Sequence, residues 1–98
     1  MGNIMAKPNE PYRYCVVESY YPDSTSGLHG PVHIRPVPGE EFPTHLRVEC
    51  SKHLMNPRIH PVGTRFRLRV KLTDREAGGE FLHSYFGWPV EVLGPGEA

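Results

Sequence analysis

The clearest pattern in the chain is a strict alternation of apolar and basic residues between Thr64 and Leu72. A period of two fits an extended strand that buries one face and exposes the other. This segment therefore predicts a half-buried strand with an apolar inner face and a basic outer face. The inner residues are Phe66, Leu68, Val70 and Leu72, and the outer residues are Arg65, Arg67, Arg69 and Lys71.

Four other regions have strand character. Residues 44–50 alternate in the same way, and so do residues 32–35, which Pro36 and Pro38 limit to the edge or end of a sheet. Residues 12–21 are apolar on both sides, which is typical of a central or bent strand. Residues 80–86 predict another strand, which breaks at Gly87-Trp88-Pro89 and resumes over residues 90–93.

A hairpin joins the alternating strand to the next one through residues 73–79, where two glycines suit positive φ. Setting Leu72 opposite Glu80 places Lys71 opposite Phe81, Arg69 opposite His83 and Arg67 opposite Tyr85, and on the other face Phe66 opposite Phe86. A slip of one residue would set the arginines against the core. We therefore expect this register, or one shifted by two residues.

Helices are nearly excluded, because eleven prolines interrupt most windows long enough to form one. Residues 51–56 are the exception, with Ser51 as a helix cap and Pro57 as a stop. We expect flexible tails over residues 1–11 and 94–98, and a single domain over residues 12–93.

Five or six short strands in so short a chain predict an all-β fold, a small antiparallel barrel. The order of three strands, a short helical turn and two strands is that of an OB-like barrel. An SH3-like barrel is the alternative.

Composition narrows the class of partner. Eleven basic and eleven acidic side chains cancel, which argues against a protein that simply coats nucleic acid or an anionic membrane. Residues 1–11 contain no apolar run, and no stretch is long enough for a membrane span, so we expect neither a signal peptide nor membrane contact. Cys15 and Cys50 lie in apolar strand patterns and are expected to stay reduced in a cytoplasmic protein.

Charge is nevertheless uneven, since residues 42–71 carry seven basic side chains and one acid, Glu49. Arginines that alternate with aromatic rings are typical of proteins that bind single-stranded nucleic acid, where rings stack on bases and cations contact phosphates. The same residues would also stabilise a sheet without any ligand. The candidate site for single-stranded nucleic acid or another polyanion is Arg35, Arg47, Arg65, Arg67, Arg69, Lys71 and Tyr85.

Other kinds of site are less well supported. The spacing of Cys50, His53 and His60 does not match a zinc site, and Cys50 continues the apolar phase of its strand. We expect no enzyme, metal or cofactor. The alternative function is protein interaction or assembly, through an exposed strand edge or the aromatic segment around Trp88, although the core is the favoured place for Phe86 and Trp88. The biological role and the oligomeric state stay open.

Overall fold

The computed structural model describes residues 4–6, 12–22, 32–75 and 79–96, and strands dominate these ranges. The mostly-β prediction is confirmed, and so is the short helical turn, in which Ser51 caps the helix by accepting a hydrogen bond from the backbone N–H of His53 at 3.3 Å. The elements are β1 (Ile4–Ala6), β2 (Arg13–Tyr20), β3 (His33–Pro36), β4 (Val48–Glu49), the 3₁₀ helix η1 (Lys52–Met55), β5 (Thr64–Arg75), β6 (Gly79–His83) and β7 (Glu91–Pro95).

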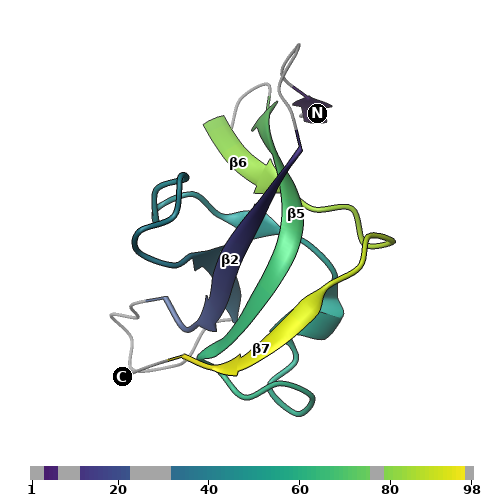
Figure 1. Cartoon of the computed structure of the whole chain (residues 1–98). Coiled ribbons are helices and arrows are strands. Elements are labelled where there is room, and N and C mark those ends of the chain that lie inside the picture. Colours follow the sequence, from purple (N-terminus) through teal and green to yellow (C-terminus); the bar gives the residue numbers. More distant parts are fainter. Residues whose placement is uncertain (1–3, 7–11, 23–31, 76–78, 97–98) are drawn as a thin grey trace.

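The long strand β5 organises the sheet. Its first half pairs antiparallel with β2 and with β7, which lie on either side of it (Figure 1), and its second half pairs antiparallel with β6 and with β1. Since β5 is shared by so many partners, its apolar face lies at the centre of the molecule. The alternating segment from Thr64 to Leu72 is thus the middle of the fold.

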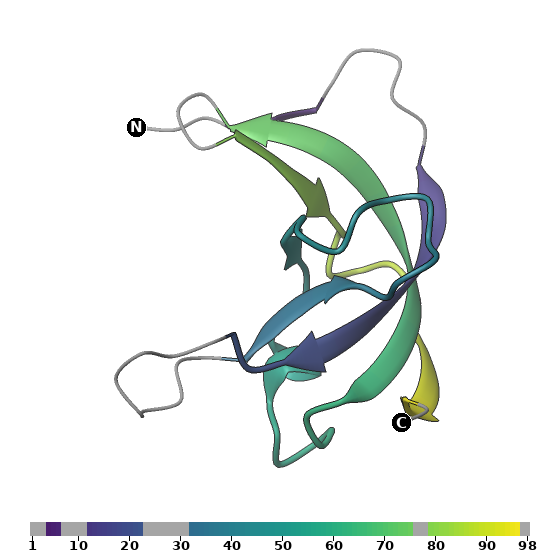
Figure 2. The same ribbon diagram turned by 90° about the vertical axis from the view of Figure 1, so that its left-hand side faces the viewer.

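The sheet follows the order β3-β2-β5-β6-β4, in which β4 and β6 are parallel. The strands curve strongly, which brings β3 and β4 side by side (Figure 2). No strand pairing joins β3 to β4 within the described ranges, so the sheet is not closed.

The inner face of β5 builds the core as the alternation predicts. Phe66, Leu68 and Val70 are fully buried, and Leu72 packs against them. They meet apolar residues from β2, β3, β4, β6 and η1, which are Cys15, Val17, Ile34, Val48, Leu54 and Leu82. Burial of these side chains is the main force holding the curved sheet together.

The hairpin register is the alternative shifted by two residues. Leu72 lies opposite Leu82 rather than Glu80, and Lys71 lies opposite His83. An even shift keeps both apolar faces inward, which is why the alternation cannot distinguish the two registers. β6 begins at Gly79, whose positive φ of 81° fits the expected turn chemistry. The predicted pairing of Arg67 with Tyr85 is wrong, because Arg67 lies opposite Glu91.

Three boundaries also differ from the prediction. Only Val48–Glu49 of the segment 44–50 is a strand, because Pro43 begins a turn in which its carbonyl accepts a hydrogen bond from Leu46. Ile4–Ala6, within the predicted N-terminal tail, pairs with β5. Gly94 and Pro95, within the predicted C-terminal tail, belong to β7, where Gly94 takes a positive φ at a bulge opposite β5.

Candidate cationic and aromatic binding surface

The outer faces of β2 and β5 form a row of paired tyrosines and cations. Lys71 Nζ lies 4.8 Å from the ring centre of Tyr12. Arg69 lies 5.4 Å from the ring centre of Tyr14 and donates a hydrogen bond to its hydroxyl at 3.2 Å. Tyr14 opposes Arg69 in the strand register, so the pairing of the backbones sets these contacts. Both tyrosines stay largely in water, with Tyr14 64% exposed.

The turn after β6 adds more aromatic rings to this row. The carbonyl of Tyr85 accepts a hydrogen bond from the backbone N–H of Trp88, and the turn places the Trp88 ring 4.7 Å from Tyr12 and 5.8 Å from Tyr85. Arg69 also lies 5.6 Å from the Trp88 ring centre. The aromatic–cationic patch comprises Tyr12, Tyr14, Arg69, Lys71, Tyr85 and Trp88.

Phe86 lies beside this patch and is 75% exposed. The prediction that it belongs to the core is wrong, because the strand ends at His83 and the turn carries Phe86 outward. Trp88 is only half-buried. The sequence suggests the basic face and the aromatic segment as two separate candidates, but the part of the basic face at Arg69 and Lys71 and the aromatic segment form one surface.

Two carboxylates neutralise Arg65 and Arg67 of β5. Arg67 binds Glu91 of β7 through Nε and Nη2, at 2.9 and 2.5 Å. Arg65 lies 3.9 Å from Glu18, which also accepts a hydrogen bond from Arg35 at 3.0 Å. The pattern along the chain does not reveal Glu18 or Glu91, since only the strand pairing shows that they face the arginines. A shallow hollow of about 390 Å³ lies between Tyr14, Arg67 and Glu91.

The two other predicted site residues lie in a separate place. Arg35 is on β3 and Arg47 immediately precedes β4. The Arg35 guanidinium lies 4.0 Å from the ring centre of Tyr20, and the same ring packs edge-on against His33 at 5.9 Å. We call Tyr20, His33, Arg35 and Arg47 the β3–β4 cluster. The structure thus places Arg69, Lys71 and Tyr85 in the aromatic–cationic patch and Arg35 and Arg47 in the β3–β4 cluster. Arg65 and Arg67 belong to neither group and lie in ion pairs with Glu18 and Glu91.

The aromatic residues of β2 are the main members that sequence reasoning missed. Tyr14 and Tyr20 of β2, and Tyr12 immediately before it, are separated by even numbers of residues and share one face of the extended chain. That period of two is visible in the sequence, but the apolar run of residues 14–17 conceals it. In contrast, Phe81, expected on the outer face, is 3% exposed; with Leu82 also buried, both faces of β6 are covered there.

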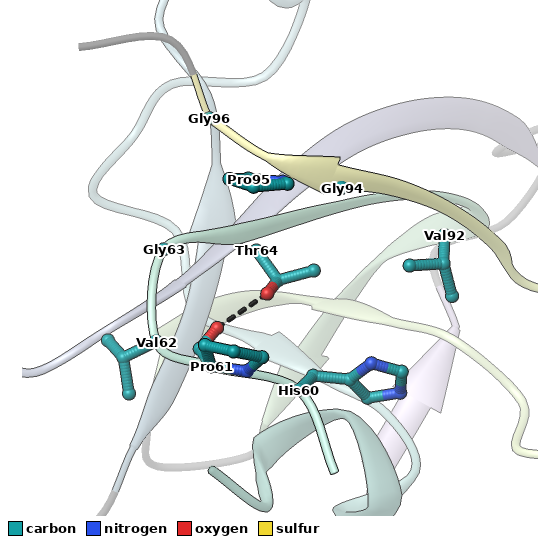
Figure 3. A pocket seen from close by; sticks show the side chains of 9 residues that line it. All are labelled: His60, Pro61, Val62, Gly63, Thr64, Val92, Gly94, Pro95 and Gly96. Atoms are coloured by element: carbon teal, nitrogen blue, oxygen red, sulfur yellow. Dashed lines mark hydrogen bonds between the residues drawn. The ribbon is translucent and has the colours of Figure 1, made fainter.

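A pocket of about 340 Å³ lies at the other end of β5 (Figure 3). Among the described residues that line it, His60 is the only one with a titratable side chain, and its ring packs edge-on against Phe66 at 5.1 Å. Apolar side chains and glycines supply most of the wall that the described residues form. The lining residues are His60, Pro61, Val62, Gly63, Thr64, Val92, Gly94, Pro95 and Gly96.

Neither cysteine has the environment of a nucleophile. Burial and the nearby Glu40 raise the pKa of Cys15 to about 12, and burial and Glu49 raise the pKa of Cys50 to about 12. Both thiols therefore stay protonated near neutral pH. Among the described residues, no three histidine, cysteine or acidic side chains gather as metal ligands.

Comparisons with known proteins leave the surface as the guide to function. No protein-family model matches the chain, and neither the curated proteins nor the solved structures contain a significant match. In the ranges that the structure describes, no helix is long and apolar enough to cross a membrane.

Proposed function

We propose that the chain forms an OB-type barrel that acts as a non-enzymatic binding module in the cytoplasm. Strand connectivity supports the fold. An OB-type barrel is a five-stranded, partly open Greek-key barrel. Taking β2, β3, β4, β5 and β6 as these five strands, β2 pairs with β3 and β5, and β4 pairs parallel with β6. The η1 helix lies between β4 and β5, as in that fold.

The ligand that the surface fits best is single-stranded nucleic acid. The observation that carries this proposal is the aromatic–cationic patch, where Lys71 and Arg69 lie among the rings of Tyr12, Tyr14 and Trp88. Exposed rings stack on bases of any sequence, and the cations between them contact the phosphates that join those bases. Paired bases in a duplex do not offer their faces, so a single strand is favoured over a double one.

Fluorescence anisotropy tests this proposal directly. Labelled oligothymidylate and oligouridylate of roughly ten nucleotides, a length within the range of one OB-type domain, are titrated with the protein at low and at physiological salt. Micromolar or tighter binding that weakens steeply with salt supports the proposal. A flat trace at both salt concentrations contradicts it.

Breaking the Arg67–Glu91 ion pair is expected to strengthen oligonucleotide binding. Glu91→Gln frees Arg67 for a phosphate and removes a negative charge beside the patch, so affinity for the oligonucleotide is expected to rise about two- to fivefold. Both partners are about half-exposed, and such a pair contributes roughly 0–1 kcal/mol to stability, so the variant should stay folded. Anisotropy titration measures the change.

Glu41→Gln is the matched control, because it removes the same charge from an ion pair of similar exposure. Glu41 binds Arg13 at 2.7 Å, and Arg13 does not belong to the patch. An equal gain in both variants would indicate an effect of net charge alone, and no gain in Glu91→Gln would mean that Arg67 does not face the ligand.

A second candidate function is protein interaction, and the exposure of Phe86 favours it. Phe86 adds an apolar ring to a surface rich in tyrosine, tryptophan and arginine, the residue types that dominate protein interfaces. This function predicts association that is indifferent to salt. Light scattering at low and high salt distinguishes self-association from the nucleic-acid proposal.

A further inference from the structure

The β3–β4 cluster has the composition of an anion site and is only partly neutralised. Glu18 pairs with Arg35 and Arg65, but within the part of the chain that the structure describes no carboxylate pairs with Arg47. Arg47 is exposed, while His33 and Tyr20 are half-buried on the neighbouring strands. The cluster therefore combines one unpaired cation, one imidazole and one ring that carries a stacked guanidinium.

We propose that the β3–β4 cluster is a phosphate-binding site, in which Arg47 and His33 together hold one phosphate of a single strand that also crosses the aromatic–cationic patch. The inference rests on the proposed function for the nature of the strand, but the phosphate site can be tested by itself. Arg47 supplies the permanent charge. His33 supplies a second N–H donor when it takes up a proton on binding.

Strand β2 connects the two sites. With Tyr12 immediately before the strand, its outer row runs from Tyr14 in the patch, through Val16 and Glu18, to Tyr20 in the cluster. Eight residue steps along an extended strand cover about 26 Å, a length that several nucleotides of a single strand can follow. One continuous ligand therefore reaches both sites along the same face of β2.

The surroundings of His33 explain why an anion should bind there with a proton. Burial and the Arg47 guanidinium both lower the pKa of His33, so the free protein holds this imidazole neutral near pH 7. The other titratable or charged groups around it are Tyr20 and Glu18 on β2, Arg35 on β3, and Glu49 on β4, which lies opposite His83. A phosphate beside Arg47 offsets the repulsion and favours the imidazolium.

The coupling between phosphate binding and protonation of His33 sets how oligonucleotide affinity changes with pH. If the bound state has the higher His33 pKa, the complex binds more protons than the free protein, and affinity rises as pH falls. We expect oligothymidylate to bind about three- to tenfold more tightly at roughly pH 5.5 than at roughly pH 7.5. His33→Gln should remove most of this gain, whereas His45→Gln, which changes an exposed histidine in the turn before β4, should keep it.

The experiment uses two probes on the full chain. NMR titration of the His33 imidazole gives its pKa without ligand, with tripolyphosphate and with oligothymidylate, and Arg47→Ala is measured beside the wild type. The expected results are a His33 pKa raised by either probe, a raised pKa in free Arg47→Ala, and affinity about threefold or more weaker in that variant. The inference would be overturned if the pH dependence of oligonucleotide affinity disappeared in His83→Gln and not in His33→Gln. His83 lies opposite Lys71, in the other site.

The two proposals fail in different ways. If tripolyphosphate raises the His33 pKa but oligonucleotides do not bind, the phosphate site is supported and single-strand binding is rejected. If oligonucleotides bind but neither probe changes the His33 pKa, the phosphate site is rejected and the proposed function is retained. No response to either probe rejects both.

Discussion

Replacing Arg69 and Lys71 together with alanine is expected to weaken oligonucleotide binding by about tenfold or more. Each cation that contacts a phosphate contributes about 0.7 to the slope of log affinity against log salt for a single strand, so the slope should fall by roughly 1.4. The loss exceeds a simple charge effect because both side chains also lie against the rings of Tyr12, Tyr14 and Trp88. Anisotropy at several salt concentrations measures both quantities.

The matched control replaces Lys52 and Arg58 with alanine. This double variant removes the same charge from exposed positions in η1 and the turn after it, outside both candidate sites. It should keep the affinity and salt slope of the wild type within about twofold. Equal losses in both double variants would show that only the overall charge matters, and the aromatic–cationic patch would then lose its role.

Phe66→Ala is expected to have the largest effect on stability, lowering the free energy of unfolding by about 3–5 kcal/mol. Phe66 is fully buried near the start of β5, between Val17 of β2 and Val92 of β7 in the strand register. Alanine there leaves a cavity under both edges of the central strand. Because a small domain has a total stability of roughly 5–15 kcal/mol, the variant should unfold at much lower denaturant.

Val92→Ala provides the comparison for this core substitution. Val92 opposes Phe66 across the strand pair but is 51% exposed, so its truncation should change stability by at most about 0.5 kcal/mol. Circular dichroism during urea unfolding measures both variants, and Phe66→Leu supplies a milder core change of roughly 1–2 kcal/mol if the alanine variant does not fold. Equal effects at the two positions would contradict the burial pattern.

The two candidate sites depend on different kinds of geometry. In the aromatic–cationic patch, direct strand pairing sets Tyr14 against Arg69, and a tight turn brings Trp88 over the same row. The β3–β4 cluster instead depends on curvature, which brings the two ends of the pairing path side by side. Loss of curvature would therefore separate Arg47 from His33 while leaving Arg69 beside Tyr14.

The sequence by itself determined the inner and outer faces of the central strand β5. Alternation between Phe66 and Leu72 places each side chain on its correct face whatever the partner strand, because successive residues of an extended chain point in opposite directions. Proline spacing limited helix to one turn, and Ser51 marked where that turn begins. These are local properties of the chain, and the sequence contains them in full.

Only the tertiary structure decided which residues meet across strands. Registers that differ by two bury the same faces, so hydrophobic burial did not show that Lys71 opposes His83 or that Glu91 opposes Arg67. The exposure of Phe86 depends on where β6 ends, which in turn depends on its pairing with β4 and β5. Charge neutralisation and the grouping of tyrosines with arginines are consequences of that long-range pairing, which the pattern along a single strand does not contain.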